Sequence, residues 1–275
     1  MKLKYLGTAA AEGIPGLFCN CRVCQNALKV RGKEIKTRSQ ALLDGKILID
    51  MCPDTYMHIL NYGLDLRPIR NCIITHNHSD HLLVSEFWCR IKGIANDIEE
   101  EPFNVYLTSS GYEAAKDFLG GAFDSPRLNF VKISPFEAFD IEDYHIIPLA
   151  ANHDPKADPV IYIIEHGDKT LLYANDTGIF PDATWEYLKD YKRVFDFVSL
   201  DCTGMLLKGW VNSHMGLDTN KQLEDRMREM GLCDDNTVIY VNHFSHNGLA
   251  THEELVIEAA KLGYGVTYDG LEVEI

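Results

Sequence analysis

Short apolar runs alternate with longer amphipathic stretches along most of the chain. Runs of four to seven residues rich in Val, Ile, Leu, Phe and Tyr, bounded by turn residues, predict β-strands. The predicted strands are residues 2–6, 40–43, 46–50, 71–75, 103–107, 129–132, 144–149, 159–165, 169–174, 196–200, 237–241, 264–267 and 271–274. Apolar residues at helical spacing predict helices at residues 54–62, 84–94, 110–119, 182–192, 217–231 and 252–262.

Two pairs of these strands are predicted hairpins. The first pair, within 40–50, turns at Asp44-Gly45, and the second, 159–174, turns at Gly167-Asp168. Thirteen strands for six helices are too many for a plain doubly wound parallel sheet. The pattern therefore predicts a layered α/β fold over residues 1–275 as a single domain, with two sheets and helices outside them.

Composition narrows the class of protein. Hydrophobic residues make up 46% and charged residues 24% of the 275, which is typical of a globular protein. No apolar run approaches the roughly 18 residues of a membrane span, and the start, MKLKYLG, has no apolar leader. We expect a cytoplasmic protein with no membrane partner.

The net charge bears on the kind of partner. The chain carries 41 acidic and 26 basic residues, a formal charge of −15. Nucleic-acid binding depends largely on Lys and Arg contacts to phosphates, so no nucleic-acid partner is expected. A small phosphate-bearing substrate remains compatible, because a bound metal ion can reverse the local charge.

The segment HNHSDH, residues 76–81, follows directly on a predicted buried strand. In extended backbone, residues i and i+2 face the same way, so His76 and His78 can bind one ion. Asp80 and His81 cannot face the same way as His76 and His78 unless the chain turns. They therefore suit a second ion beside the first. The alternative interpretation is an ordinary polar loop, but so many metal-ligating residues in six positions favour a metal site.

Three further candidate ligands follow other predicted strands by a few residues. They are His153 in AANHDP, Asp176 in YANDTG and His243 in NHFSH. Each alone is compatible with an ordinary loop residue. Together they could complete the ligand sets of two ions.

These motifs resemble the metallo-β-lactamase superfamily, as do GTAAAEGIP at 7–15 and ILIDMCPD at 47–54. The resemblance covers nearly the whole chain and implies an αββα sandwich, two mixed sheets with helices outside, with the metals at one edge. It implies that Asp176 bridges two metals and that Asp50 supports a ligand. It assigns the first metal to His76, His78 and His153, and the second to Asp80, His81 and His243.

The chemistry follows from such a ligand set. Imidazole nitrogens suit Zn²⁺, and added carboxylate oxygen admits Mn²⁺, so two Zn²⁺ or Mn²⁺ ions are the expected catalytic cofactors. Two ions about 3.5–4 Å apart can share a hydroxide, because a metal lowers the pKa of water from 15.7 to about 7. The resemblance therefore implies a hydrolase.

Three of the eight cysteines are crowded into CNCRVC, as Cys19, Cys21 and Cys24. This spacing suits one structural Zn²⁺ that needs a fourth ligand, and His246, three residues after His243, is a candidate. His246 contacting substrate and three unrelated thiols are the alternatives. The other five cysteines are expected to be small buried residues.

The cysteine motif with HFSH narrows the resemblance to the PhnP-type cyclic phosphodiesterases, which implies a small phosphodiester as substrate. Proteins of pyrroloquinoline quinone synthesis have a similar cysteine cluster, but their catalytic motif is usually degraded. His214 in VNSHMGLD is the candidate general acid, with Asp80 sharing the role, although His214 could merely precede a helix. Arg38 is either a phosphate contact or part of a surface ion pair.

Other functions remain open at this point. The same ligand set serves lactone and thioester hydrolases and nucleases that process the 3′ end of transfer RNA. A carrier protein with idle metal is the non-enzymatic alternative. The family resemblance also suggests a possible homodimer.

Overall fold

The computed structural model describes residues 1–275, and its strands form two seven-stranded sheets. The first sheet has the order β14-β1-β2-β3-β4-β5-β6 and the second β13-β12-β11-β10-β9-β8-β7. The first contains β1 (Lys2–Gly7), β2 (Gln40–Leu43), β3 (Ile47–Ile49), β4 (Asn71–Ile73), β5 (Phe103–Leu107), β6 (Leu128–Lys132) and β14 (Glu272–Glu274). The second contains β7 (Phe139–Ile141), β8 (Tyr144–Ala150), β9 (Val160–His166), β10 (Lys169–Ala174), β11 (Phe197–Asp201), β12 (Val238–Asn242) and β13 (Gly265–Val266).

Both sheets are mixed, and both predicted hairpins are confirmed. Strands β2 and β3 pair antiparallel across Asp44 and Gly45, whose φ values of 49° and 71° match the turn that Asp-Gly favours. Strands β9 and β10 pair antiparallel across Gly167, with φ 61°. Strands β3 to β6 run parallel to one another, as do β10 to β13.

The two sheets pack face to face because their strands carry apolar residues on both sides. In β3, Ile47 and Ile49 lie in one core cluster with Tyr162 and Tyr173 of the second sheet. Leu48, between them in sequence, belongs to a different cluster on the outer face of the first sheet. Such alternation, with both faces apolar, is expected of strands buried on two sides.

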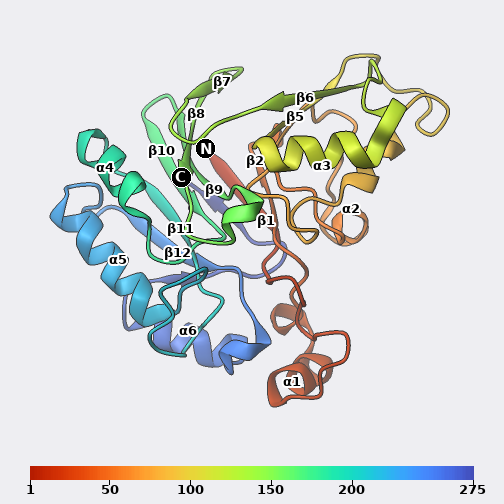
Figure 1. Cartoon of the computed structure of the whole chain (residues 1–275). Coiled ribbons are helices and arrows are strands. Elements are labelled where there is room, and N and C mark those ends of the chain that lie inside the picture. The colour runs from red at the N-terminus through yellow and green to blue at the C-terminus, as the bar shows by residue number, and fades with distance from the viewer.

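Helices cover the two outer faces, so the predicted αββα sandwich is confirmed (Figure 1). Ala115 of α3 shares a cluster with Leu48, whereas Trp185 of α4 and Leu223 of α5 share one with Leu172 of β10. The helices are α1 (Arg22–Val30), α2 (Thr55–Tyr62), α3 (Ser109–Leu119), α4 (Asp182–Asp190), α5 (Leu217–Glu229) and α6 (His252–Ala260). None of them is both long and apolar enough to cross a bilayer.

Three elements differ from the sequence prediction. The helix predicted at 84–94 is a 3₁₀ segment, Val84–Arg90, in which only Phe87 is buried, so no continuous apolar face holds an α-helix. The sequence analysis predicts no helix at α1, yet Val23, Cys24 and Ala27 give this helix a buried face. Strand β7 was not predicted, because its three residues are too few to show a periodic pattern of apolar positions.

Candidate metal centre

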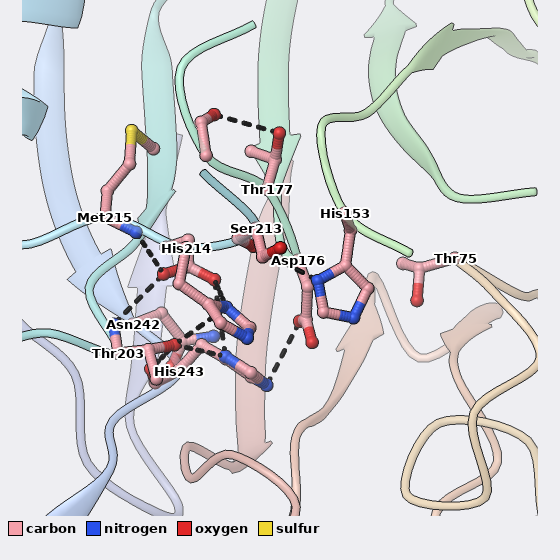
Figure 2. A network of polar contacts seen from close by, with 12 residues as sticks. Thr75, His153, Asp176, Thr177, Thr203, Ser213, His214, Met215, Asn242 and His243 are labelled. Carbon is pink, nitrogen blue, oxygen red and sulfur yellow. Dashed lines mark hydrogen bonds and ion pairs between the residues drawn. The ribbon is translucent and has the colours of Figure 1, made fainter. Parts of the chain in front are cut away.

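Strand ends from both sheets meet at one edge of the sandwich. The segment 76–81 follows β4, and His153, Asp176 and His243 follow β8, β10 and β12. The backbone N–H of Val160 donates to the carbonyl of Thr75 at 2.9 Å, which joins the sheets at this edge. Figure 2 shows the side chains from the second sheet gathered there.

The first group consists of three histidines. The Nδ1 atom of His78 lies 3.0 Å from Nε2 of His76 and 3.1 Å from Nε2 of His153. Burial lowers the pKa of His76 well below its usual range, so this imidazole stays neutral. Three imidazole nitrogens at this spacing suit a single cation.

The second group consists of Asp80, His81, Asp176 and His243, of which the last three are buried. The Nε2 atom of His81 lies 3.2 Å from a carboxylate oxygen of Asp80 and 3.2 Å from one of Asp176. Nε2 of His243 lies 3.0 Å from the other oxygen of Asp176. Asp176 also lies 3.9 Å from Nε2 of His76, so its carboxylate joins the two groups.

The residues of the second group fit a cation, because three of their atoms lack any hydrogen bond. They are Nε2 of His81, Oδ1 of Asp176 and Nε2 of His243, and all three are buried. Leaving such atoms unpaired costs about 1–3 kcal/mol each, so their convergence indicates a missing positive charge. Burial opposes protonation of His81, but Asp176, Asp80 and Asp50 outweigh it and raise its pKa well above the usual range. The surrounding carboxylates therefore stabilise a positive charge at this position. A bound metal ion could supply that charge in place of the proton on His81.

Each candidate histidine ligand has its other ring nitrogen occupied. Nδ1 of His81 donates to Asp50 at 2.7 Å, and Nδ1 of His153 donates to the carbonyl of Ser213 at 3.1 Å. The remaining pairs are His76 with Thr75, His78 with Asp154, and His243 with Thr203. These contacts select the tautomer that presents a lone pair to the space between the ligand groups. We refer to the seven residues of the two groups as the cup.

Asp50 lies behind the ligands, as the family resemblance implied. It is fully buried and accepts hydrogen bonds from the backbone N–H and hydroxyl of Thr75, at 2.8 and 3.0 Å. With His81 on its other oxygen, Asp50 fixes the orientation of a ligand and does not itself enter the cup.

His214 lies against both ligand groups. Its ring nitrogen lies within 4.8 Å of ligand atoms of His153 and Asp176. Nδ1 donates to Asp201 at 2.8 Å. Burial opposes the charged form, but the Asp201 carboxylate outweighs it and raises the pKa of His214 to about 9. His214 is thus a protonated acid at neutral pH in this structure.

Asp201 and Thr203 are functional candidates that the sequence analysis missed. Asp201 accepts from His214 and also lies 3.4 Å from Nδ1 of His243. The Thr203 hydroxyl lies 2.9 Å from the same nitrogen (Figure 2). Burial opposes ionisation of Asp201, yet His214 and His243 hold its pKa at about 2. Its place at the end of β11, in LDCTG, was the same signal that identified the other strand-end residues.

The three crowded cysteines and His246 also come together. Nδ1 of His246 lies 3.6 Å from Sγ of Cys19 and 3.8 Å from Sγ of Cys21, and Cys24 completes a group within 4.8 Å. None of these thiols forms a disulfide. Three sulfurs and one imidazole nitrogen are a typical ligand set for structural zinc. We refer to residues 16–24 with His246 as the knuckle.

Two single-residue expectations have clear outcomes. Arg38 pairs with Asp54, Nε to Oδ2 at 3.2 Å, which supports the ion-pair interpretation without using its terminal amino groups. Of the five remaining cysteines, four are buried as expected, but Cys89 is exposed. Cys89 lies in the 3₁₀ segment Val84–Arg90, which buries only Phe87.

Comparison with known proteins gives one family match. Residues 46–244 match the model of the Beta-lactamase superfamily domain. Among curated proteins, an octanoyltransferase of Porphyromonas gingivalis is 24% identical over 287 residues, an alignment that covers all of this chain and 52% of that protein. The chain therefore spans about half the length of that relative.

Solved structures show the same fold over the whole chain. A diphosphatase of the PhnP family has a TM-score of 0.74 at 24% identity, covering 100% of this chain and 96% of that one. The Zn²⁺-bound PqqB of Methylobacterium extorquens has a TM-score of 0.74 at 20% identity, covering 100% of both chains.

Proposed function

The chain belongs to the β-lactamase superfamily, and from this premise we propose that it is a metal-dependent hydrolase, namely a phosphodiesterase acting on small, including cyclic, phosphodiesters. One observation carries the proposal. Two groups of ligating atoms share the Asp176 carboxylate, and a protonated histidine, His214, lies against both. This arrangement suits displacement at a charged phosphorus centre followed by departure of an alkoxide.

The candidate ligands divide between two cations. His76, His78 and His153 would hold one, Asp80, His81 and His243 the other, and Asp176 both. When bound, two Zn²⁺ or Mn²⁺ ions supply an activated water and neutralise charge on the phosphoryl oxygens. The mostly imidazole donor set favours Zn²⁺, and the carboxylates admit Mn²⁺.

The chain itself supplies the proton for the leaving group. Asp201 holds His214 as an imidazolium, which can donate its Nε2 proton to the departing alkoxide oxygen. General acid catalysis of this kind contributes about 10²–10⁴-fold in rate. Asp80, whose side chain is 14% exposed, is the second candidate for moving a proton between the cup and solvent.

A third cation would occupy the knuckle as structural zinc. Its ligands tie residues 16–24 to the segment that follows His243, so this zinc would hold one wall of the active site in place. The wild-type protein should therefore contain three metal ions per chain, two in the cup and one in the knuckle.

The proposal is tested by metal analysis together with a substrate panel. We expect the zinc- or manganese-loaded protein to hydrolyse ribose cyclic phosphates, 2′,3′-cyclic nucleotides and an aryl phosphodiester. Asp176→Ala should abolish this activity, whereas Asp168→Ala, in the turn between β9 and β10, should retain it. A loaded wild-type protein that hydrolyses no diester would contradict the proposal.

Thioester hydrolysis is a second candidate function. The relative named as an octanoyltransferase supports it, because that name denotes acyl transfer. The same cup could direct water at an acyl carbon. Activity on octanoyl thioesters or lactones, with none on diesters, would favour this alternative. Activity on precursor transfer RNA alone would favour a nuclease, which the charge of −15 disfavours.

A further inference from the structure

The hydrogen bonds behind the cup form one continuous path between two candidate ligands of the same cation. The path begins at His81, whose Nδ1 donates to Asp50, and ends at Phe244, the residue after His243. Between these ends it runs through side chains that the mechanism proposed above does not use. We refer to them as the rear network: Gln40, His58, Thr37, Asp269 and Thr8.

Gln40 connects the path to the backbone of Asp50. Its Nε2 donates to the Asp50 carbonyl and to the hydroxyl of Thr55, each at 2.9 Å. Its Oε1 accepts from Nδ1 of His58 at 2.7 Å. The opposite orientation of the amide would set Oε1 against the Asp50 carbonyl, where neither oxygen can donate. The contacts therefore fix how Gln40 and His58 lie, and both side chains are fully buried.

Thr37 connects His58 to the other half of the path. Its hydroxyl lies 2.8 Å from Nε2 of His58 and 2.6 Å from an oxygen of Asp269. That oxygen also accepts from the Thr37 backbone N–H at 2.7 Å, and the other Asp269 oxygen accepts from the Thr8 hydroxyl at 2.7 Å. The Thr8 carbonyl accepts from the backbone N–H of Phe244 at 2.8 Å. The path thus reaches the backbone that follows β12.

Both ends of the path hold backbone that is unfavourable for an ordinary residue. Asp50 has φ 68° and His243 has φ 62°, in the left-handed region that residues other than glycine rarely adopt. Such conformations persist only where the surrounding contacts hold them. The bond from Gln40 acts on the peptide unit directly after Asp50, and the bond to Thr8 acts on the peptide unit directly after His243.

We propose that the rear network positions His81 and His243 against each other and thereby sets the affinity of the cation assigned to Asp80, His81 and His243. Its members are positioning residues, because they act through Asp50 and Phe244. The loss of such an outer contact typically weakens metal binding about 10–100-fold. The histidines assigned to the other cation make no hydrogen bond with the rear network, so the effect is confined to one of the two cup ions. The inference rests on the metal binding of the proposed function and not on its substrate.

The experiment sets stepped free zinc concentrations with a chelator and counts the ions that the zinc-loaded protein keeps, by native mass spectrometry. Thr37→Val removes the hydroxyl between His58 and Asp269, and it should raise the free zinc needed to keep one cup ion by at least about tenfold. Thr8→Val breaks the path at another link and should have the same effect. Thr37→Ser restores the hydroxyl and should restore most of the affinity. Anomalous diffraction from crystals of Thr37→Val at limiting zinc should show that the weakened ion lies between His81 and His243.

Thr237→Val is the matched control. Thr237 is half-buried like Thr37, and its hydroxyl also takes part in two contacts. It donates to the Phe195 carbonyl at 2.8 Å and accepts from the Asp234 backbone N–H at 2.9 Å. Because Thr237 lies at the opposite end of β12 from His243, Thr237→Val should lose similar thermal stability to Thr37→Val but keep all its ions as the wild type does. This comparison separates positioning from general destabilisation.

Two results would overturn the inference. They are zinc retention in Thr37→Val equal to that of the wild type, and equal losses of affinity in Thr37→Val and Thr237→Val. Diester hydrolysis by a protein whose zinc affinity does not depend on Thr37 would retain the proposed function and remove the role of the rear network. Thr37-dependent zinc affinity without diester hydrolysis would do the reverse. A wild type that keeps no cup ion would contradict both.

Discussion

Replacing Asp201 by Asn tests the link between the proposed general acid, His214, and the carboxylate that it contacts. Asp201 accepts from Nδ1 of His214 at 2.8 Å, and its other oxygen accepts from the backbone N–H groups of Thr203 and Met215, at 3.0 and 3.1 Å. Asparagine has almost the same shape and can still accept from the backbone. The substitution therefore removes the negative charge beside His214 with little change in packing.

The structure gives the size of the effect. Raising the pKa of His214 from 6.5 to about 9 corresponds to about 3 kcal/mol in favour of the imidazolium. Without the carboxylate, burial and His81 lower the pKa and Asp176 alone raises it, so we expect the pKa to fall back to about the ordinary 6.5. At pH 7.5 the protonated fraction then falls from nearly all to about one tenth or less. Turnover that needs this acid should fall at least about tenfold.

The assay compares two leaving groups across pH. An alkoxide needs the proton of His214, whereas p-nitrophenolate leaves without it. We expect Asp201→Asn to slow an alkyl diester at least about tenfold and an aryl diester by less than about threefold at pH 7.5. Because the acid must be protonated, wild-type turnover of the alkyl diester should fall as pH rises through the pKa of His214. In the variant this fall should lie about two pH units lower.

Asp196→Asn, at the residue immediately before β11, is the matched control and should keep both the rates and the pH profile. Metal content is measured in parallel, because Asp201 also lies near His243. Equal loss on the two diesters with full metal, or an unshifted pH profile, would refute the acid role of the Asp201–His214 pair.

Three further predictions concern metal binding and stability. Asp176→Asn should reduce cup metal by one to two ions per chain while keeping the knuckle ion, measured by mass spectrometry; full occupancy would mean that Asp176 is not a ligand. Cys21→Ser should lose about one zinc ion and bind substrate more weakly, and unchanged metal and kinetics would exclude the knuckle site. Trp185→Ala should lower the free energy of unfolding in urea by about 3–5 kcal/mol, since Trp185 is 1% exposed and packs on Phe180. The exposed Trp88→Ala should cost less than about 1 kcal/mol, and equal losses would contradict the core assignment.

Sequence periodicity predicted most of the fold because the buried strands are long and apolar on one or both faces. Strand β10 was recognisable for this reason, because its sequence, KTLLYA, ends in a run of four apolar residues. Helix α1 was not, because a metal-binding pattern and a helix overlap in the same residues. The 3₁₀ segment at Val84–Arg90 was predicted as a helix because Val84, Phe87, Trp88 and Ile91 have helical spacing, but Phe87 is the one buried residue of the segment.

The candidate site could be predicted where ligating residues cluster or follow strands. HNHSDH is dense enough to be recognised alone, whereas His153, Asp176 and His243 gain meaning only as a set. Asp201 was missed because a single carboxylate at a strand end does not indicate a role until its contacts are known. Its contacts His214 and His243 lie 13 and 42 residues away in sequence. Contacts of that kind depend on the packing of several strands, which no local pattern specifies.

The central claim is that the seven gathered side chains hold two cations around Asp176. Crystals grown with zinc and measured at the zinc absorption edge test it most directly. The account predicts two anomalous peaks about 3.5–4 Å apart in the cup, with Asp176 between them, and a third peak at the cysteines. An empty cup in zinc-saturated crystals, and in crystals saturated with manganese, would contradict it.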